Sequence, residues 1–471
     1  MRLGALTGGD EPARVTGFAI DHRKVAPGTV FGAFQGARFD GEGFIPDAVR
    51  NGAVAVVARP EVKVEGAAHI AAPRPRCEFA RLAAKYFAPF PETIVAVTGT
   101  NGKTSNVEMA RQLWRMAGHP SASIGTLGVT TSDDQVTTGL TTPDIVTFLS
   151  NMAGLERLGI THAAFEASSH GLSQYRSEGI DVRAAAFTNF SRDHLDYHET
   201  MQAYFEAKMR LFDEVVAADG TAVIWMDDPK SAEVLARCRA RGLATLTVGA
   251  QGETLRLVKR ETTAMGQKLI IEAGGKTKTV ALGLIGAYQA ANALTAAGLA
   301  IATGGEVEET LANLGRIHPV RGRLERAVIS ANGAPVYVDY AHTPDAIEAA
   351  CLALRPHTKD RLIIVFGAGG DRDQGKRAEM GAVAARLADR VIVTDDNPRG
   401  EEPGAIRAAI LKGAVGATEI GGRRKAIRAA LAGAGAGDVI LLAGKGHEQG
   451  QIVGDKVLPF DDVTVAREEV A

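Results

Sequence analysis

The chain has 471 residues, of which 45% are hydrophobic and 23% charged. At roughly 150 residues per domain, this length predicts about three globular domains. The 53 Lys and Arg residues nearly balance the 55 Asp and Glu residues, and a net charge of -2 argues against non-specific nucleic-acid binding as the main function. The 3 cysteines are scattered along the chain, so they predict neither a disulfide framework nor a zinc site.

The sequence contains no apolar run that approaches the ~20 residues of a membrane span. The N-terminal stretch MRLGALTGGDEPAR also lacks the apolar core of a signal peptide. We therefore expect a cytoplasmic monomer with no membrane span and no nucleic-acid partner.

Three proline-rich breaks, at 72–76, 88–92 and 316–322, divide the chain. We expect domains at 1–88, 89–317 and 318–471. In the first block, apolar runs at 28–34 and 51–58 predict two buried strands of a small α/β domain.

The middle block opens with the apolar run TIVAVTG, a glycine-rich loop and a stretch of helical periodicity from Ser105 to Gly118. The loop sequence VTGTNGKTS fits the phosphate-loop pattern GxxxxGK[ST] at its end, but Val97 stands where the first glycine belongs. A plain strand-to-helix turn with a surface lysine is the alternative, which the strand before and the helix after disfavour. We expect Lys103 to contact the β- and γ-phosphates of a nucleotide and Thr104 to hold magnesium.

Later runs in the middle block, at 162–168, 182–190 and 221–226, alternate with helical stretches and favour a mostly parallel sheet. Glu166 ends the first of these runs, and it is either a metal-binding carboxylate or a solvent-facing strand tip. His194, in TNFSRDHLDYH, is either a metal ligand or a structural histidine.

The spacing of Phe205, Lys208, Met209 and Phe212 places all four residues on one face of a predicted helix, and this face is otherwise apolar. The side chain of Lys208 either extends along this face toward water or has a lowered pKa that makes it chemically special.

The last block contains four strand-like runs that each end in a polar or glycine-rich turn, namely APVYVDY, RLIIVFGAGG, RVIVTDDNPR and DVILLAGKGHE. In doubly wound sheets ligands bind beyond the carboxyl ends of the strands, so we expect these four endings to line one crevice. Basic clusters at 321–323, 369–377 and 421–425 point to small anionic ligands in this block.

Ten motifs occur in the order of the Mur ligase family, which the chain resembles from residue 21 to 462. They are VTGTNGKTS, EASSH, TNFSRDHLDYH, the helix of Lys208, GAYQAAN, VRGRLE, VDYAHTPDA, FGAGGDRDQGKR, TDDNPRGEEP and AGKGHE. The resemblance implies an α/β fold of three domains: a small N-terminal domain for the uridine end of a substrate, a central P-loop ATPase and a C-terminal Rossmann-like domain. The family's glycine loop is TGTNGKT, which accounts for Val97.

The resemblance also implies an activity. It is the ATP-dependent, ADP-forming addition of meso-diaminopimelate to the D-Glu γ-carboxylate of UDP-MurNAc-L-Ala-D-Glu, through an acyl phosphate, in peptidoglycan precursor synthesis. ATP and Mg²⁺ are the implied cofactors, and the implied catalytic residues are Lys103, His194 and a carbamylated Lys208. The implied metal ligands are Thr104, Glu166, His194 and Lys208. The implied ATP contacts are Gly99, Thr100, Asn101, Gly102, Lys103, Thr104, Ser105, Asn292, Arg323 and Asp339.

The same match implies contacts for the other two substrates. For the UDP-substrate they are His22, Thr141, Thr142, Ser168, Gln174 and Arg176. For diaminopimelate they are Arg372, Asp396, Asn397, Pro398, Arg399, Gly444 and Glu448. Arg399 would bind the distal carboxylate, and Glu448 would face the distal ammonium. The chain departs from the family twice, with His22 where serine is usual and Trp225 where asparagine is usual.

Other functions stay open as alternatives. Within the class, these are a ligase that adds lysine and a folylpolyglutamate-type enzyme; Arg399 and the separate N-terminal domain argue against both. A regulatory ATP-binding module predicts the loss of Glu166, His194 or Lys208, and all three are present. A dehydrogenase is disfavoured because FGAGGD does not complete GxGxxG, and a hydrolase because no GxSxG elbow is present.

Overall fold

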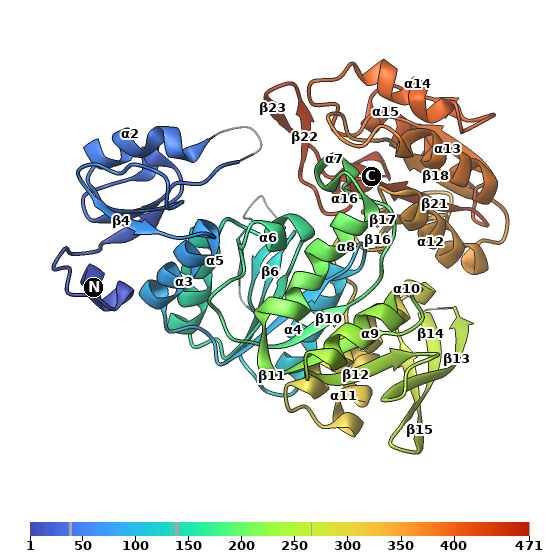
Figure 1. The fold of residues 1–471 in the computed structure, drawn as a ribbon. Coiled ribbons are helices and arrows are strands. Elements are labelled where there is room, and N and C mark those ends of the chain that lie inside the picture. The colour runs from blue at the N-terminus through green and yellow to red at the C-terminus, as the bar shows by residue number, and fades with distance from the viewer. Residues whose placement is uncertain (37–39, 133, 137–140, 265, 471) are drawn as a thin grey trace.

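The computed structural model describes residues 1–36, 40–132, 134–136, 141–264 and 266–470. Its strands form four sheets of 4, 11, 6 and 2 strands. Figure 1 shows the chain running through three bodies, from the blue N-terminal body through the central one to the orange and red C-terminal body. This arrangement confirms the predicted three-domain α/β fold class. No helix among the described residues has both the length and the apolar character needed to cross a membrane.

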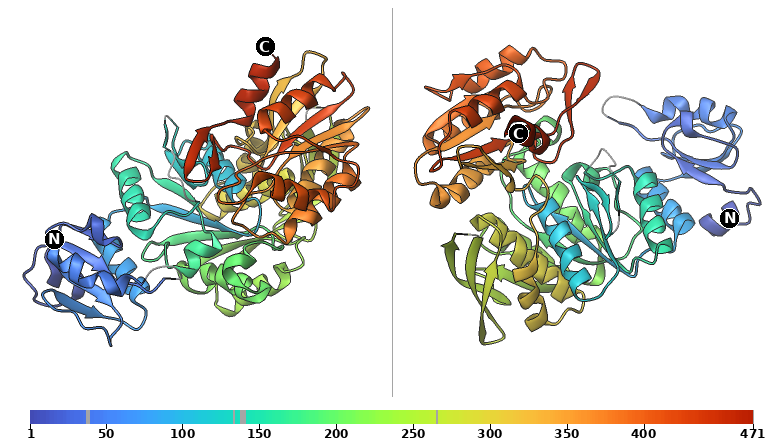
Figure 2. Two further views of the ribbon diagram at one scale, coloured as in Figure 1. Left: turned by 90° about the horizontal axis from the view of Figure 1, so that it is seen from above. Right: turned by 180° about the vertical axis from the view of Figure 1, so that it is seen from behind.

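The N-terminal body is a four-stranded parallel sheet with helices packed against it. The two predicted strands are present as β2 and β3. Phe79 of α3 fills the core with edge-on contacts to Phe18 and Phe34. Helix α3 also contacts α5 of the central body, and Figure 2 shows the first body standing apart from the rest. The elements are α1 (Leu3–Thr7), β1 (Gly17–Ala19), η1 (His22–Lys24), β2 (Thr29–Gly32), η2 (Gly41–Phe44), α2 (Ile45–Arg50), β3 (Ala53–Ala58), β4 (Ala68–Ala71) and α3 (Pro75–Phe87).

The central sheet has the order β15-β14-β13-β12-β11-β10-β5-β9-β6-β7-β8. Its middle, from β12 to β6, is parallel as predicted. The strands are β5 (Thr93–Thr98), β6 (Ser121–Gly125), β7 (Gly128–Thr130), β8 (Gln135–Val136), β9 (His162–Glu166), β10 (Val182–Phe187), β11 (Val216–Trp225), β12 (Ala244–Gly249), β13 (Leu255–Thr263), β14 (Gly266–Ala273) and β15 (Lys276–Leu282).

Antiparallel strands flank this parallel middle on both sides, which the sequence analysis did not anticipate. Gly274 and Gly275, both with positive φ, form the turn between β14 and β15. Successive positive φ values suit the tight turn of a β-hairpin, because that turn twists in the same sense as its strands.

Helices cover both faces of the central sheet. Ile94 and Ala96 of β5 belong to one buried cluster and Val95 and Val97 to another, so alternate side chains of this strand enter separate cores. Burial on both faces explains why the strand appears in the sequence as a continuous apolar run. The helices are α4 (Lys103–Met116), α5 (Ile145–Arg157), α6 (Ser169–Ser173), α7 (Leu195–His198), α8 (Met201–Arg210), η3 (Leu211–Val215), α9 (Ser231–Ala240), α10 (Ala287–Ala302), α11 (Val307–Asn313) and η4 (Leu314–Arg316).

The C-terminal sheet has the order β16-β17-β21-β18-β19-β20, and it is parallel except for β16. The four predicted runs form β17, β21, β18 and β19, which are neighbours in the sheet, so their carboxyl ends meet at one edge. The elements are β16 (Glu325–Ile329), β17 (Pro335–Asp339), α12 (Pro344–Leu354), η5 (Arg355–His357), β18 (Leu362–Phe366), α13 (Lys376–Leu387), β19 (Arg390–Val393), α14 (Pro403–Leu411), β20 (Thr418–Glu419), α15 (Arg423–Ala432), β21 (Val439–Ala443), β22 (Gly450–Val453), β23 (Lys456–Pro459) and α16 (Asp462–Val470).

Candidate active site

The glycine-rich loop connects β5 to α4. Val97 lies fully buried within β5, and the loop starts after the strand ends at Thr98. Gly99 and Gly102 have φ values of 147° and 88°, which side chains rarely adopt. Gly102 is the N-cap residue of α4, so the loop presents the amino end of a helix, the geometry that binds phosphate.

Two lysine side chains meet at this loop. Lys103 Nζ donates to the carbonyls of Gly99 and Thr100 at 2.9 and 2.8 Å, and Lys208 Nζ donates to the same Gly99 carbonyl at 2.7 Å. Lys208 is 1% exposed and its Nζ lies 4.3 Å from the centre of the Tyr204 ring. Burial and the nearby charge of Lys103 place the pKa of Lys208 well below its ordinary value. Lys208 therefore does not extend toward water, and the first of its two alternatives is excluded.

Glu166 is 1% exposed at the end of β9, which excludes a solvent-facing strand tip. Its carboxylate accepts hydrogen bonds from the Thr126 amide at 2.7 Å and the Thr126 hydroxyl at 3.1 Å. Both donors are neutral, and the Lys103 side chain is a nearby cation that interacts with this buried carboxylate. Carboxylate and hydroxyl oxygens are also the ligands that magnesium prefers, so the oxygens of Glu166 and of nearby hydroxyl groups suit a magnesium ion as well.

Thr104, at the start of α4, is 4% exposed. Its hydroxyl accepts a hydrogen bond from Arg323 Nη2 at 2.8 Å. The Arg323 guanidinium also lies over the ring of Tyr340, 4.6 Å from the ring centre. Arg323 thus reaches the phosphate loop from the start of the C-terminal body, although 219 residues separate it from Thr104.

His194 has φ 53° and precedes α7. Burial lowers the pKa of His194 to about 3, although the adjacent Asp193 carboxylate opposes this shift. The neutral imidazole is the form that ligates metals. The described residues contain no group of three His, Cys, Asp or Glu side chains arranged to hold a metal, so a metal ligated by His194 would need other donors, such as hydroxyl oxygens.

A cavity of about 400 Å³ lies beside the loop and receives Asn101, Gly102 and Ser105. Asn292 of α10 lines it and accepts a hydrogen bond from Asn106 at 3.0 Å. Further lining residues that the sequence analysis did not assign come from several elements: Asn189, Trp225, Asp227, Asp228, Tyr288, Tyr340 and Asp345. We call this space the nucleotide cavity, because several of its lining residues are ones for which the resemblance implies contacts to ATP.

Asp339 lines the nucleotide cavity, but its carboxylate is occupied by the chain itself. It accepts hydrogen bonds from the amides of Leu324 and Ala341 at 2.7 and 2.8 Å and from the Tyr288 hydroxyl at 3.2 Å. These contacts hold the backbone beside Arg323, so the side chain of Asp339 positions the loop that reaches Thr104.

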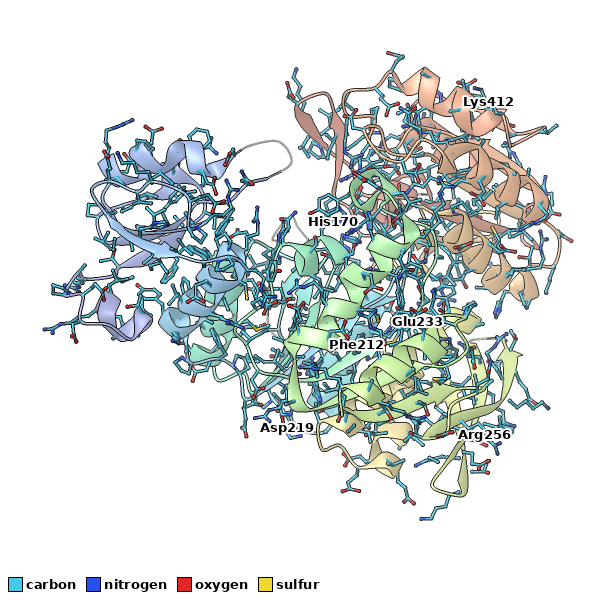
Figure 3. The ribbon with its side chains drawn as sticks, in the orientation of Figure 1. His170, Phe212, Asp219, Glu233, Arg256 and Lys412 are labelled. Atoms are coloured by element: carbon cyan, nitrogen blue, oxygen red, sulfur yellow. The ribbon has the colours of Figure 1, made fainter. Side chains whose placement is uncertain are left out.

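A second cavity, of about 370 Å³, receives side chains from both the central and the C-terminal bodies. The four predicted strand ends of the C-terminal sheet contribute to it, as expected. His170, labelled in Figure 3, lines it at the start of α6, and Asp193 and His194 line it as well. We call this space the acceptor cavity, because it is lined by residues for which the resemblance implies contacts to the acceptor amino acid. The predicted residues in its lining are Thr141, Thr142, Ser168, Arg176, His194, Arg372, Asp396, Asn397, Arg399, Gly444 and Glu448.

Three predicted substrate residues do not line the acceptor cavity. Gln174 contacts a lining residue, since its side-chain oxygen accepts a hydrogen bond from Arg176 Nη2 at 2.7 Å. Pro398 is buried next to Arg399. His22 lies in the N-terminal body, where its ring stacks on Phe44 with ring centres 4.3 Å apart.

Arg399 is held by its backbone as well as by its side chain. Its φ is 51°, its amide donates to the Ile452 carbonyl at 3.1 Å, and its carbonyl accepts from Gly454 at 2.7 Å. Its guanidinium donates to the Gly370 carbonyl at 2.9 Å. A left-handed conformation at a bulky residue persists only where its surroundings enforce it, and such residues cluster at functional sites.

Charges of both signs face the acceptor cavity. Arg176, Arg372, Lys376 and Arg399 are cationic, whereas Asp193, Asp196, Asp373, Asp396 and Glu448 are anionic. This mixture suits ligands that carry several carboxylates together with an ammonium group. Tyr340 and His342 line both cavities, so the two spaces share one wall.

Comparisons with known proteins agree on one family. Models described as "Mur ligase family, catalytic domain", "Mur ligase middle domain" and "Mur ligase, glutamate ligase domain" match residues 14–116, 97–300 and 322–446. The chain is 60% identical over 460 residues to the UDP-N-acetylmuramoyl-L-alanyl-D-glutamate--2,6-diaminopimelate ligase of Zymomonas mobilis subsp. mobilis, covering 97% of this chain and 95% of the relative. It is 51% identical to the ligase of the same name from Bradyrhizobium diazoefficiens, with coverage of 98% and 97%.

Solved structures give the same result. A structure of a UDP-N-acetylmuramoyl-L-alanyl-D-glutamate--2,6-diaminopimelate ligase superposes with a TM-score of 0.72 at 31% identity, covering 100% of this chain and 98% of the other. A MurF ligase from Thermotoga maritima in complex with ADP has the same fold, with a TM-score of 0.62, 20% identity and 97% coverage of both chains.

Proposed function

The chain belongs to the Mur ligase family, and from this premise we propose that it adds 2,6-diaminopimelate, in its meso form, to the D-Glu γ-carboxylate of UDP-MurNAc-L-Ala-D-Glu. It is an ATP-dependent, ADP-forming ligase of peptidoglycan synthesis. One observation supports the substrate assignment: most of the residues expected for the UDP-substrate and most of those expected for diaminopimelate line a single cavity, and only His22, Gln174 and Pro398 do not. A carboxylate and an amine that must be joined can therefore meet there.

Joining a carboxylate to an amine in water requires activation of the carboxylate. We propose that the γ-carboxylate takes the terminal phosphoryl group of ATP, and that the amine then attacks the acyl phosphate and releases phosphate. Lys103 lies at the loop that faces the nucleotide cavity, where its charge lowers the cost of phosphoryl transfer. This chemistry needs positioning and electrostatics and no nucleophilic side chain.

We propose that Thr104 and Glu166 hold one magnesium ion and that His194 and a carbamylated Lys208 serve a second. Bound magnesium supplies positive charge to the phosphoryl oxygens and orients them. Lys208 suits carbamylation because its pKa is lowered by burial, and a neutral amine can add carbon dioxide. Carbamylation converts the amine into a carboxylate-like oxygen ligand, the type that magnesium prefers.

We also propose roles for residues at the substrates. Asn292, Arg323 and the loop Gly99–Ser105 bind ATP, and Asp339 supports them. The acceptor cavity takes diaminopimelate, with the Arg399 guanidinium on the distal carboxylate and Glu448 on the distal ammonium. For the UDP-substrate the proposed contacts are His22, Thr141, Thr142, Ser168, Gln174 and Arg176.

We propose domain boundaries after residues 88 and 317. Helix α3 ends at Phe87 and β5 begins at Thr93, while η4 ends at Arg316 and β16 begins at Glu325. Each boundary thus falls in a connection between bodies. We further propose that the chain acts as a monomer, because a single chain supplies the lining of both cavities.

The decisive experiment is an amino-acid panel with UDP-MurNAc-L-Ala-D-Glu and ATP, with phosphate release as the readout. We expect turnover with meso-diaminopimelate and none when either the dipeptide substrate or the amino acid is omitted. Equal turnover with lysine would disprove the acceptor specificity, and no turnover with any amino acid would disprove the ligase assignment.

The acceptor cavity is tested separately with Arg399→Ala. We expect the KM for diaminopimelate to rise about tenfold or more, because a bidentate charged contact is lost, while the affinity for ATP is unchanged. A fall in ATP affinity in this variant would mean that the acceptor site is misplaced.

A further inference from the structure

Lys445 lies in the turn that follows β21 and is completely buried. Its Nζ donates to Asn397 Oδ1 at 3.1 Å, to Glu448 Oε2 at 3.0 Å and to the Gly450 carbonyl at 2.7 Å. An ammonium group has three N–H donors, and each has one acceptor here. Lys445 belongs to the motif AGKGHE but has no role in the proposed mechanism.

The contacts of Lys445 orient two side chains of the acceptor cavity. Asn397 Oδ1 accepts from Lys445 and from the Ile452 amide at 3.0 Å, which turns the amide nitrogen of Asn397 toward Glu448 Oε2 at 2.8 Å. Glu448 Oε2 therefore accepts from both Lys445 and Asn397. Among the described residues, none donates a hydrogen bond to Glu448 Oε1, and Glu448 lines the cavity. One carboxylate oxygen is fixed by the protein and the other stays available to a ligand.

The same lysine reaches the arginine side of the cavity through the β22–β23 hairpin. Lys445 binds the carbonyl of Gly450 at the start of β22, and two residues further along the strand Ile452 accepts a hydrogen bond from the Arg399 amide at 3.1 Å. Lys445 thus contacts the Glu448 carboxylate directly and reaches the backbone of Arg399 through strand β22.

We propose that Lys445 is a positioning residue for acceptor specificity, which sets the carboxylate of Glu448 to receive the distal ammonium of diaminopimelate. This inference rests on the proposed function. Lys445 and Asn397 hold Oε2 of Glu448, so that Oε1 presents its lone pairs to the cavity. A fixed acceptor loses less entropy on binding and discriminates more strongly against ligands that lack the ammonium group.

The test compares Lys445→Met with the unaltered enzyme on two acceptors. One is meso-diaminopimelate, and the other is 2-aminoheptanedioate, which keeps both carboxylates but lacks the distal amino group. We expect the KM for diaminopimelate to rise about tenfold to 100-fold in the variant, with the KM for ATP unchanged. The preference for diaminopimelate over 2-aminoheptanedioate, measured as a ratio of kcat/KM values, should fall by a similar factor.

A double-mutant cycle separates positioning from a purely structural role. If Lys445 acts through Glu448, Lys445→Met should add little to the loss of preference already caused by Glu448→Gln. Independent, multiplying effects on the preference would overturn the proposal, and so would an unchanged preference in Lys445→Met. Lys412→Met is the matched control, because Lys412 is exposed at the end of α14 on the outer surface of the C-terminal body (Figure 3).

The melting temperature of each variant shows whether it is folded. If Lys445→Met does not fold, Lys445→Arg replaces it, because arginine retains a cation with a different geometry. Turnover of the unaltered enzyme with diaminopimelate tests the proposed function itself. Its absence would refute that function, whereas normal turnover with an unaltered preference in the variant would refute only the role of Lys445.

Discussion

The carbonyl oxygen of Gly99 accepts hydrogen bonds from the side chains of Lys103 and Lys208. Two ammonium groups on one acceptor repel each other, and burial penalises both charges. Lys208 responds more strongly, because its pKa falls well below the ordinary value while it stays sealed among aromatic and apolar side chains. The fold therefore favours the uncharged form of Lys208 beside its phosphate loop.

This residue gives the first prediction. Lys208→Ala should lower kcat on the order of 100-fold, because an oxygen ligand near the phosphoryl group is lost. Short carboxylic acids should restore part of the activity by replacing the missing carbamate. Intact-mass spectrometry of the unaltered enzyme should also show one added carbon dioxide, absent from the variant. Lys276→Ala, at an exposed lysine, is the control, and full activity of Lys208→Ala would rule out the carbamate.

Trp225 gives the second prediction at this scale. It lines the nucleotide cavity at the end of β11, whereas the chain's other tryptophan, Trp114, is buried on α4 with its indole nitrogen donating to Thr303 at 3.0 Å. ADP should therefore change the fluorescence of the Trp114→Phe variant but not that of Trp225→Phe. Trp225→Asn should weaken ADP binding about tenfold, because a base loses its aromatic neighbour. A fluorescence change that persists in Trp225→Phe would place the base elsewhere.

At the scale of elements, the unit of β5, loop and α4 depends on glycine at its turn. A Cβ atom at Gly102 would lie 2.5 Å from Asn292 Oδ1, and φ at this position is 88°. Gly102→Ala should therefore displace Asn292 and reduce nucleotide affinity by about tenfold or more, as calorimetry with ADP can measure.

Gly118, at the other end of the same helix, provides the control for backbone strain. Its φ is 87°, but a Cβ atom there meets nothing within 4 Å. Gly118→Ala should lower the melting temperature, because alanine is strained at this positive φ. It should leave the affinity for ADP unchanged. Equal loss of ADP affinity in both variants would contradict the proposed role of the Gly102 contact.

Parallel strands that are buried on both faces, such as β5, β9 and β18, could be predicted from the sequence because each appears as an apolar run. The ends of β17, β18, β19 and β21 could be placed at one crevice because the carboxyl ends of parallel strands meet at the same edge of a sheet. The hairpin strands β13 to β15 expose one face and carry many charged side chains, so no apolar run marked them. The hydrophobic pattern of the sequence therefore did not predict these three strands.

The candidate site was predictable in part. The motifs indicated which residues belong together, but they did not indicate how each side chain is held. Lys445 looked like a polar turn residue, and only the fold shows its complete burial among three acceptors. Likewise, the contact from Arg323 to Thr104 joins residues 219 positions apart, and its existence depends on how the bodies pack.

At the scale of the whole molecule, the acceptor cavity is a product of two bodies. The central body supplies Thr142 and Arg176, and the C-terminal body supplies Arg399 and Glu448. Contacts between these bodies carry charge, including Lys376 with Asp193 at 3.8 Å. Catalysis therefore depends on the relative placement of the bodies as well as on the local geometry within each.

Burial of histidines across the molecule makes stability depend on pH. Burial lowers the pKa of His162, His198 and His342 to about 4 and that of His447 to about 3, whereas an unfolded histidine titrates near 6.5. Between these values the unfolded chain binds protons that the folded chain does not, so stability falls as the pH falls from 6.5 toward 4. The raised pKa values of Asp228 and Asp339 act in the opposite sense but involve fewer groups.

The melting temperature should therefore fall by several degrees between pH 7.5 and pH 5.5 at constant ionic strength, since each histidine contributes up to about 1.3 kcal/mol at the lower pH. Circular dichroism follows this directly. His162→Phe keeps a ring against Trp114 and His119 but removes one protonation site, so its melting temperature should fall less over the same interval. A melting temperature that stays constant or rises on acidification would show that these imidazoles are not held neutral by the fold.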